Sequence, residues 1–242
     1  MKQIKYIILA LIISSCETEN NPNTTSNTGQ GGSLAQFTIA GSYLYTVDEN
    51  SLNVFNLVNP ESPVLVNKVF VGFNIETLFN ENDFLYIGSQ TGMFIYSLSN
   101  PEEPKKLAAV SHFRACDPVI ANNTHAFVTL DGSDGCGGNI SVLEIYDITE
   151  ITNPILVSSR TLIAPKGLGL FNNYLFVCDD EVKIFDITNP EESVLVKAIN
   201  ISAFDVIIRE NQLFVIGENN LYQYQLDETD INNIVPLSVI NI

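Results

Sequence analysis

The sequence predicts an all-β domain made of repeated units, and three features carry this prediction. An Asn-Pro pair recurs at a spacing of roughly 40 residues, at 59–60, 100–101, 153–154 and 189–190. Each pair follows a run rich in β-branched and aromatic residues, and no stretch of 11 or more residues has a helical period. Repeats of this length with four short strands are typical of propeller blades. We therefore predict a β-propeller of about five four-stranded blades over residues 34–242, with a two-sheet sandwich as the alternative.

Each unit shows the same order of four short strands. The first is a short apolar run, near Phe37, Leu78, Val119, Leu168 and Val206. The second reads YLYTV from 43, FLYIG from 84, HAFVT from 125, YLFVC from 174 and QLFVI from 212, each after a pair of turn residues. The third ends close before the Asn-Pro pair, and the fourth follows it, as in PVLVNKV and PILVSSR. The fifth unit has Val235-Pro236 in place of Asn-Pro.

The N-terminus predicts export and lipid anchoring. Two lysines precede an apolar run over residues 6–13, which is too short for a membrane span of about 20 residues and is typical of a secretory signal. The string Ile13-Ser14-Ser15-Cys16 resembles the bacterial lipobox, which implies cleavage before Cys16 and lipidation of Cys16. We expect residues 1–15 to be the signal peptide and residues 16–33 a lipidated, disordered tether on the outer membrane, periplasmic or surface-exposed. A soluble secreted product is the alternative.

Composition limits the partners. The chain has 28 Asp+Glu and 11 Lys+Arg, a net charge of −17, which becomes −19 once Lys2 and Lys5 leave with the signal peptide. This charge disfavours nucleic acid and anionic lipid surfaces. Neutral glycans, basic proteins and cations remain as partners. Tryptophan is absent, which disfavours a sugar-stacking platform, although tyrosine and phenylalanine are plentiful.

Several strings resemble the LVIVD repeat, which occurs in bacterial surface and exported proteins. They are IFDITNPEESVLV and IYDITEITNPILV, with LFVCD and LYTVD before them. The resemblance covers residues 34–242, is interrupted in the third unit and is weak in the fifth. It implies a propeller with a binding or scaffolding role and supplies no catalytic residues. Asp147 and Asp186 end the third strand of their units, where Asn56, Ser97 and Gln225 stand in the others, so we expect a local backbone hydrogen bond at this position.

The third unit differs from the others by an insertion. The string DGSDGCGGN, from Asp131, lies between its second and third strands, on the side of the blade where the link over residues 111–117 also emerges. Insertions on one face of a repeat fold are often binding loops. We expect a candidate binding face there, and a purely structural loop is the alternative. Its residues are His112, Arg114, Asp117, Asp131 and Asp134.

The cysteines predict one disulfide. Export places them in an oxidising compartment, and the shared face brings Cys116 and Cys136 together. Cys178 aligns with Val47, Gly88, Thr129 and Ile216, so we expect a small core residue with a free thiol. No metal or other cofactor is predicted. The string DGSDG fails the calcium-loop spacing and is expected to be a solvated turn, and a zinc set of His112, Cys116 and Cys136 lacks the usual ligand spacing.

An enzymatic alternative comes from the inner rim of the expected ring. In each unit, one residue lies two positions before the apolar residue that marks the first strand. These residues are Ala35, Glu76, Asp117, Lys166 and Phe204, and Asp205 follows the last of them. Glu76 and Asp117 could act as the acid and base pair of a glycosidase. We favour a binding or protein-interaction scaffold without catalysis, because charged residues at an open channel mouth are more often solvated than catalytic. A glycan-active enzyme is the alternative.

Overall fold

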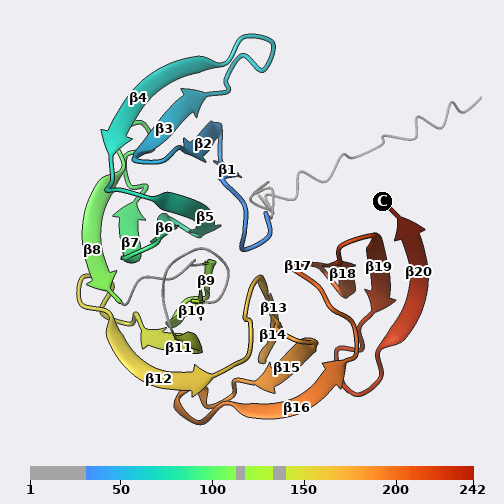
Figure 1. Cartoon of the computed structure of the whole chain (residues 1–242). Helices are drawn as coiled ribbons and strands as arrows, with labels where there is room; N and C mark the ends of the chain where they lie inside the picture. The colour runs from blue at the N-terminus through green and yellow to red at the C-terminus, as the bar shows by residue number, and fades with distance from the viewer. Residues whose placement is uncertain (1–30, 113–117, 133–139) are drawn as a thin grey trace, which may run out of the picture.

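The computed structural model describes residues 31–112, 118–132 and 140–242, which form five four-stranded antiparallel sheets around a common axis (Figure 1). In every sheet the strands follow chain order from the axis outward. The predicted all-β propeller with five blades is therefore confirmed. Within these ranges one short 3-10 helix, η1 (Pro190–Glu192), is present, and no helix is long and apolar enough to span a membrane.

The blades are numbered 1 to 5 in chain order. Blade 1 comprises β1 (Phe37–Ala40), β2 (Tyr43–Val47), β3 (Ser51–Asn56) and β4 (Val64–Phe70); blade 2 comprises β5 (Ile75–Glu81), β6 (Phe84–Ser89), β7 (Gly92–Ser97) and β8 (Lys105–Ser111). Blade 3 comprises β9 (Val119–Ala121), β10 (His125–Asp131), β11 (Ser141–Asp147) and β12 (Ile155–Thr161). Blade 4 comprises β13 (Leu168–Phe171), β14 (Tyr174–Cys178), β15 (Val182–Asp186) and β16 (Val194–Ile199); blade 5 comprises β17 (Asp205–Arg209), β18 (Gln212–Ile216), β19 (Asn220–Gln225) and β20 (Val235–Asn241).

Local side chains close the turns of each blade as the sequence suggested. In four blades, a side-chain oxygen of the last residue of the third strand accepts a hydrogen bond from the backbone N–H two residues later. The distances are 2.8 Å for Asn56, 3.1 Å for Ser97, 2.8 Å for Asp147 and 2.8 Å for Asp186. In blade 5, Gln225 donates instead to the carbonyl of Asn211. The expectation that this position is structural is confirmed for the aspartates.

A bulge occurs at the same place in every blade, between the third and fourth strands. The register shifts at Val54/Phe55, Ile95/Tyr96, Ile145/Tyr146, Ile184/Phe185 and Gln223/Tyr224. A bulge increases the twist of a strand pair, so the outer strand of each blade turns away from the inner three. No feature of the sequence pattern indicated this bulge.

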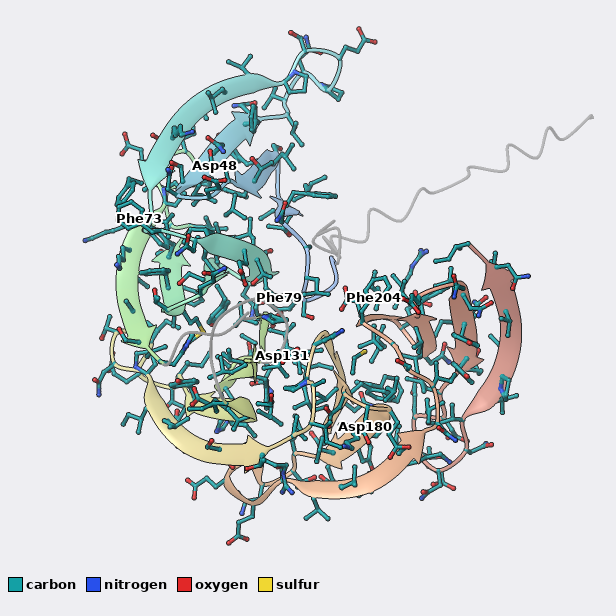
Figure 2. All side chains as sticks on the ribbon, in the orientation of Figure 1. Asp48, Phe73, Phe79, Asp131, Asp180 and Phe204 are labelled. Atoms are coloured by element: carbon teal, nitrogen blue, oxygen red, sulfur yellow. The ribbon has the colours of Figure 1, made fainter. Side chains whose placement is uncertain are left out.

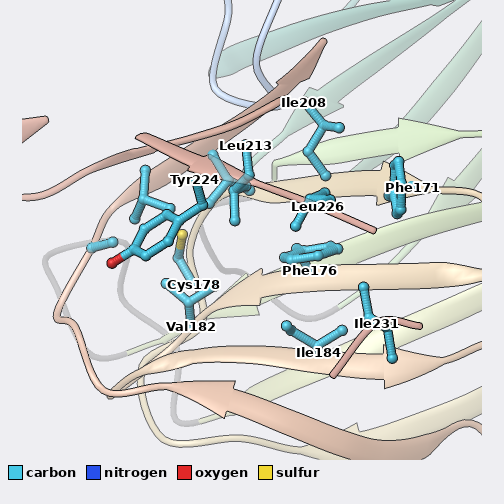
Figure 3. Packing of buried hydrophobic residues seen from close by; sticks show 13 residues of the cluster. Phe171, Phe176, Cys178, Val182, Ile184, Ile208, Leu213, Tyr224, Leu226 and Ile231 are labelled. Atoms are coloured by element: carbon cyan, nitrogen blue, oxygen red, sulfur yellow. The ribbon is translucent and has the colours of Figure 1, made fainter. Parts of the chain in front are cut away.

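Neighbouring blades pack through alternate residues of their second strands. The second and fourth residues of this strand contact the preceding blade, as Leu213 and Val215 do, and the third contacts the following blade, as Phe176 does. Figure 3 shows this packing between blades 4 and 5. Cys178 belongs to the same cluster and is a buried free cysteine, as predicted.

The ring of blades is open. Inner strands of successive blades contact one another, β1 with β5, β5 with β9, β9 with β13 and β13 with β17. No contact of comparable extent joins β1 to β17, and Figure 1 shows an open sector between blades 1 and 5. Blades 1 and 5 therefore each present one face that no other blade covers.

A short segment before β1, residues 31–36, crosses the axis and is called the strap. Ser33 Oγ donates to Asp205 Oδ1 in blade 5 (3.2 Å) and accepts from the Leu168 N–H in blade 4 (2.7 Å). The Leu78 N–H in blade 2 donates to the Ala35 carbonyl (2.7 Å). Gly32 and Ser33, which end the segment expected to be a tether, are buried. These two residues therefore pack with the propeller.

Candidate functional site

A pocket of about 430 Å³ lies at the axis of the ring. Its walls come from the strap, from residues at the start of the inner strands of blades 2, 3 and 4, and from the end of β10. The lining residues are Leu34, Gln36, Glu76, Thr77, Pro118, Asp131, Pro165 and Lys166. The pocket thus combines two carboxyl groups, one ammonium group and several apolar surfaces.

Two of the rim residues expected from the sequence meet in this central pocket. Glu76 is the second residue of β5, and its Oε1 accepts from Gln90 Nε2 at 2.9 Å. Lys166 precedes β13. Its backbone N–H donates to the Cys178 carbonyl at 2.7 Å, and its own carbonyl accepts from Thr129 Oγ1 at 2.5 Å. The rim argument therefore placed Glu76 and Lys166 correctly at the axis.

Asp131 was expected in a solvated turn, and that expectation is wrong. It is the last residue of β10, pairs with Ser141 and is 5% exposed. The hairpin of β10 and β11 is longer than its counterparts, so the strand carries Asp131 into the central pocket. Figure 2 shows Asp131 near the axis.

The remaining residues of the expected binding face are placed only in part. His112 follows β8, is half-buried and does not line the central pocket. Arg114, Asp117 and Asp134 lie outside the described residues, as do Cys16 and the expected disulfide partners Cys116 and Cys136. The glycosidase pair of Glu76 and Asp117 thus has only Glu76 within the described chain.

Asp205, which follows the expected rim residue Phe204, is buried, and the sequence pattern did not indicate this burial. It begins β17, is 7% exposed and accepts hydrogen bonds from Ser33 Oγ and from its neighbour Val206 N–H. Burial raises the pKa of Asp205 to about 6. A Cβ at Gly32 or Gly167 would lie 2.3 or 2.2 Å from its carboxylate oxygens, so the strap and blade 4 enclose this carboxyl closely.

Two further hollows differ from the central pocket in chemistry. One of about 410 Å³ lies between the strap, β1 and β17, and is lined by Gly31, Gly32, Leu34, Ala35, Phe37, Thr38, Ile39, Asp205 and Ile207. Another of about 640 Å³ lies on blades 1 and 2 at the opposite end of β5. Its lining includes Tyr43, Glu81 and Asp83 but no basic side chain. Of these three hollows, only the central pocket combines acidic and basic groups.

Comparisons with known proteins agree with this architecture. Residues 31–71 match the family model of the LVIVD repeat. The match covers blade 1 together with the strap. No curated protein matches the chain significantly.

Several solved structures share the fold. A protein from Lactobacillus plantarum aligns with a TM-score of 0.69 at 12% identity, over 83% of this chain and 69% of that protein. The periplasmic gluconolactonase PpgL of Pseudomonas aeruginosa aligns with a TM-score of 0.64 at 12% identity, over 84% and 68%. Hsv2 of Kluyveromyces lactis aligns with a TM-score of 0.53 at 14% identity, over 83% and 60%. At these identities the likeness shows the propeller fold alone.

This chain matches only part of the longer solved structure from Lactobacillus plantarum. Since 83% of this chain is about 200 residues, the unmatched 31% of the Lactobacillus plantarum protein is about 90 residues. The five blades of this chain therefore superpose on part of a longer chain.

Proposed function

We propose that this protein is a lipid-anchored protein of the bacterial cell envelope that binds a neutral, polyhydroxylated ligand in its central pocket. The observation that supports this best is the meeting of Glu76, Asp131 and Lys166 in one pocket at the axis. A pocket of about 430 Å³ is within the range of about 300–1,000 Å³ found for small-molecule sites.

The chemistry of the lining favours a sugar over an anion. Each sugar hydroxyl both donates and accepts, so carboxylate oxygens and an ammonium group can bind neighbouring hydroxyls of one ring. The net charge of −17 repels anionic ligands over most of the surface. Leu34, Pro118 and Pro165 supply apolar surface for the carbon skeleton.

Replacing Glu76 by glutamine should weaken binding of a sugar by about tenfold or more, because a hydrogen bond to a charged group contributes about 1.5–3 kcal/mol. The measurement is calorimetric titration with a panel of neutral mono- and disaccharides. Glu61→Gln, an exposed acid in the link between β3 and β4, is the matched control and should bind as the unmodified protein does. Equal affinity of both variants and the unmodified protein would place the ligand elsewhere.

A hydrolytic function is the second candidate, and the same pair of carboxyl groups favours it. Glu76 and Asp131 could act as acid and base on a sugar lactone or glycoside. The gluconolactonase of Pseudomonas aeruginosa shares the fold, which adds to this candidate. Titrating acid release from glucono-δ-lactone, corrected for spontaneous hydrolysis, separates the two functions. Turnover that is lost in Glu76→Gln supports an enzyme, and sugar binding without turnover supports a binding protein.

Lipid anchoring has its own test. Cys16→Ser should leave either an uncleaved precursor or a protein released from membranes, because the acyl chains supply about 0.8 kcal/mol of anchoring free energy per buried methylene. Membrane fractionation combined with intact-mass measurement checks this. A variant that stays with the membranes at its mature mass contradicts the anchoring proposal and leaves the pocket proposal untouched.

A further inference from the structure

One half of the strap, residues 35–36, is anchored to blades 1 and 2. The Ala35 carbonyl accepts from the Leu78 N–H of β5 at 2.7 Å, and the Gln36 carbonyl accepts from the Val47 N–H of β2 at 2.9 Å. Both hydrogen bonds join main-chain groups, so neither depends on an ionisable side chain. We call these two residues the anchored half and expect them to stay in place when a side chain elsewhere changes its charge.

The other half, residues 31–34, is held through the carboxyl group of Asp205 in blade 5. Ser33 Oγ donates to this carboxyl at 3.2 Å and accepts from the Leu168 N–H of blade 4 at 2.7 Å. The Leu34 N–H also hydrogen-bonds to the Asp205 carboxyl. Leu34 is the one apolar side chain of residues 31–34, and it is half-buried. Segments with so few apolar contacts are the ones that open locally while the rest of a fold stays intact.

The Asp205 carboxyl is closed off from water by the strap and by blade 4. Neither Gly32 nor Gly167 leaves room for a Cβ beside its two oxygens. Its hydrogen-bond donors are the Ser33 hydroxyl and two backbone N–H groups, all of them uncharged. Burial is the largest cause of the shift that raises the pKa of Asp205 to about 6.

The other titratable groups near Asp205 come from blade 4. The Cys178 thiol in β14 interacts electrostatically with Asp205, and burial raises the pKa of this thiol, so the thiol stays neutral. Lys166, the residue before Gly167, lines the central pocket. The strap and the lining of the hollow between β1 and β17 contribute no ionisable side chain besides Asp205. The charge of the strap's contact with blade 5 is thus set by the Asp205 carboxyl.

Leu34 separates two hollows. It lines the central pocket of about 430 Å³ together with Gln36, and it lines the hollow of about 410 Å³ between β1 and β17 together with Asp205. The strap is therefore a wall that these two hollows share. Movement of residues 31–34 away from Asp205 takes Leu34 out of this wall and joins the two hollows.

We propose that residues 31–34 are a pH-controlled latch on the wall of the central pocket. When the Asp205 carboxyl is protonated, the latch is closed and the two hollows are separate. Ionisation of Asp205 favours the open latch, because a carboxylate is hydrated in the open position and desolvated in the closed one. The anchored half stays in place and serves as the hinge. The latch controls access to the central pocket whatever the pocket binds, so it does not rest on the sugar proposed for it.

The size of the effect follows from the two pKa values of Asp205. In the closed latch the value is about 6, and an unperturbed aspartate, as in the open latch, has 3.8. The closed position binds the proton more tightly, so closure is favoured at low pH and is lost as the pH rises through about 6. Between pH 5 and pH 8 the ratio of closed to open latch should fall about tenfold.

Amide hydrogen exchange of the full chain tests the latch, followed for each residue by NMR and corrected for the intrinsic pH dependence of exchange. The N–H groups of Leu34 and Leu168, which bond within the latch, should lose about tenfold of their protection from pH 5 to pH 8. The N–H groups of Val47 and Leu78 bond to the anchored half of the same strap and should keep their protection.

Two variants separate ionisation from packing. Asp205→Asn cannot ionise, so the protection of the two latch N–H groups should no longer change between pH 5 and pH 8. Gly32→Ala places a Cβ against the Asp205 carboxyl and should hold the latch open at both pH values. In both variants the two N–H groups bonded to the anchored half should stay protected.

Four results would overturn the proposal. One is latch protection that is equal at pH 5 and pH 8 in the unmodified protein, and another is a pH dependence that survives in Asp205→Asn. A third is Gly32→Ala with the latch as protected as in the unmodified protein at pH 5. The fourth is an equal loss of protection at Val47 and Leu78, which means that the whole strap or ring opens and not residues 31–34.

Discussion

Replacing Phe176 by alanine should lower the free energy of unfolding by about 3–5 kcal/mol, the usual loss for a fully buried phenylalanine. Phe176 is 0% exposed and packs between blades 4 and 5 with Ile184, Leu213 and Tyr224 (Figure 3). The truncation removes apolar contacts from both blades and leaves a cavity that the rigid sheets fill poorly. Urea unfolding followed by circular dichroism measures the loss.

Phe214→Ala is the matched control, because Phe214 holds the same position in blade 5 but faces the open sector. It is half-buried, so its truncation should cost less than about 2 kcal/mol. Equal losses in the two variants would mean that this side of blade 5 is covered in the isolated protein. That outcome would contradict an open ring of five blades.

Asp205 should make the protein less stable at neutral pH than at mildly acid pH. Burial raises its pKa to about 6, against 3.8 for an unperturbed aspartate. The folded protein therefore binds a proton more tightly than the unfolded chain does, and the stability from this group is lost as the pH rises through about 6. The difference between these two pKa values corresponds to about 3 kcal/mol in the free energy of unfolding.

Asp205→Asn isolates this effect, since asparagine keeps the shape and does not ionise. The free energy of unfolding of the variant, minus that of the unmodified protein, should rise by about 2–3 kcal/mol between pH 3 and pH 7. Taking the difference cancels the opposite contributions of exposed aspartates such as Asp48, whose pKa the Lys68 ammonium lowers. A difference that stays constant with pH would show that the strap does not enclose an ionisable Asp205.

The repeat pattern was sufficient to predict the strands and the number of blades. The Asn-Pro pairs and the strings that begin at Tyr43, Phe84, His125, Tyr174 and Gln212 mark the second and fourth strands because each blade must repeat the same turns and the same alternation. The strap was not predictable from composition. Gly31, Gly32 and Ser33 are typical of a flexible linker, whereas in the fold Ser33 forms hydrogen bonds with the Asp205 carboxyl and the Leu168 N–H.

The site was predictable in part. Glu76 and Lys166 were found because the residues that enter inner strands must converge at the axis. Asp205 was named beside the expected rim residue Phe204, but its burial was not expected, because one step along a strand reverses the direction of a side chain. Asp131 was expected in a turn because glycines follow it in the sequence, and glycines are typical of turns. In the structure β10 extends as far as Asp131.

Hydrogen–deuterium exchange of the full mature protein, with and without the sugar that binds best in the titrations, tests the central pocket most directly. The account predicts slower exchange in residues 75–77, 128–131 and 165–168, which surround Glu76, Asp131 and Lys166. Protection confined to the acidic hollow on blades 1 and 2, near Tyr43 and Glu81, would contradict it.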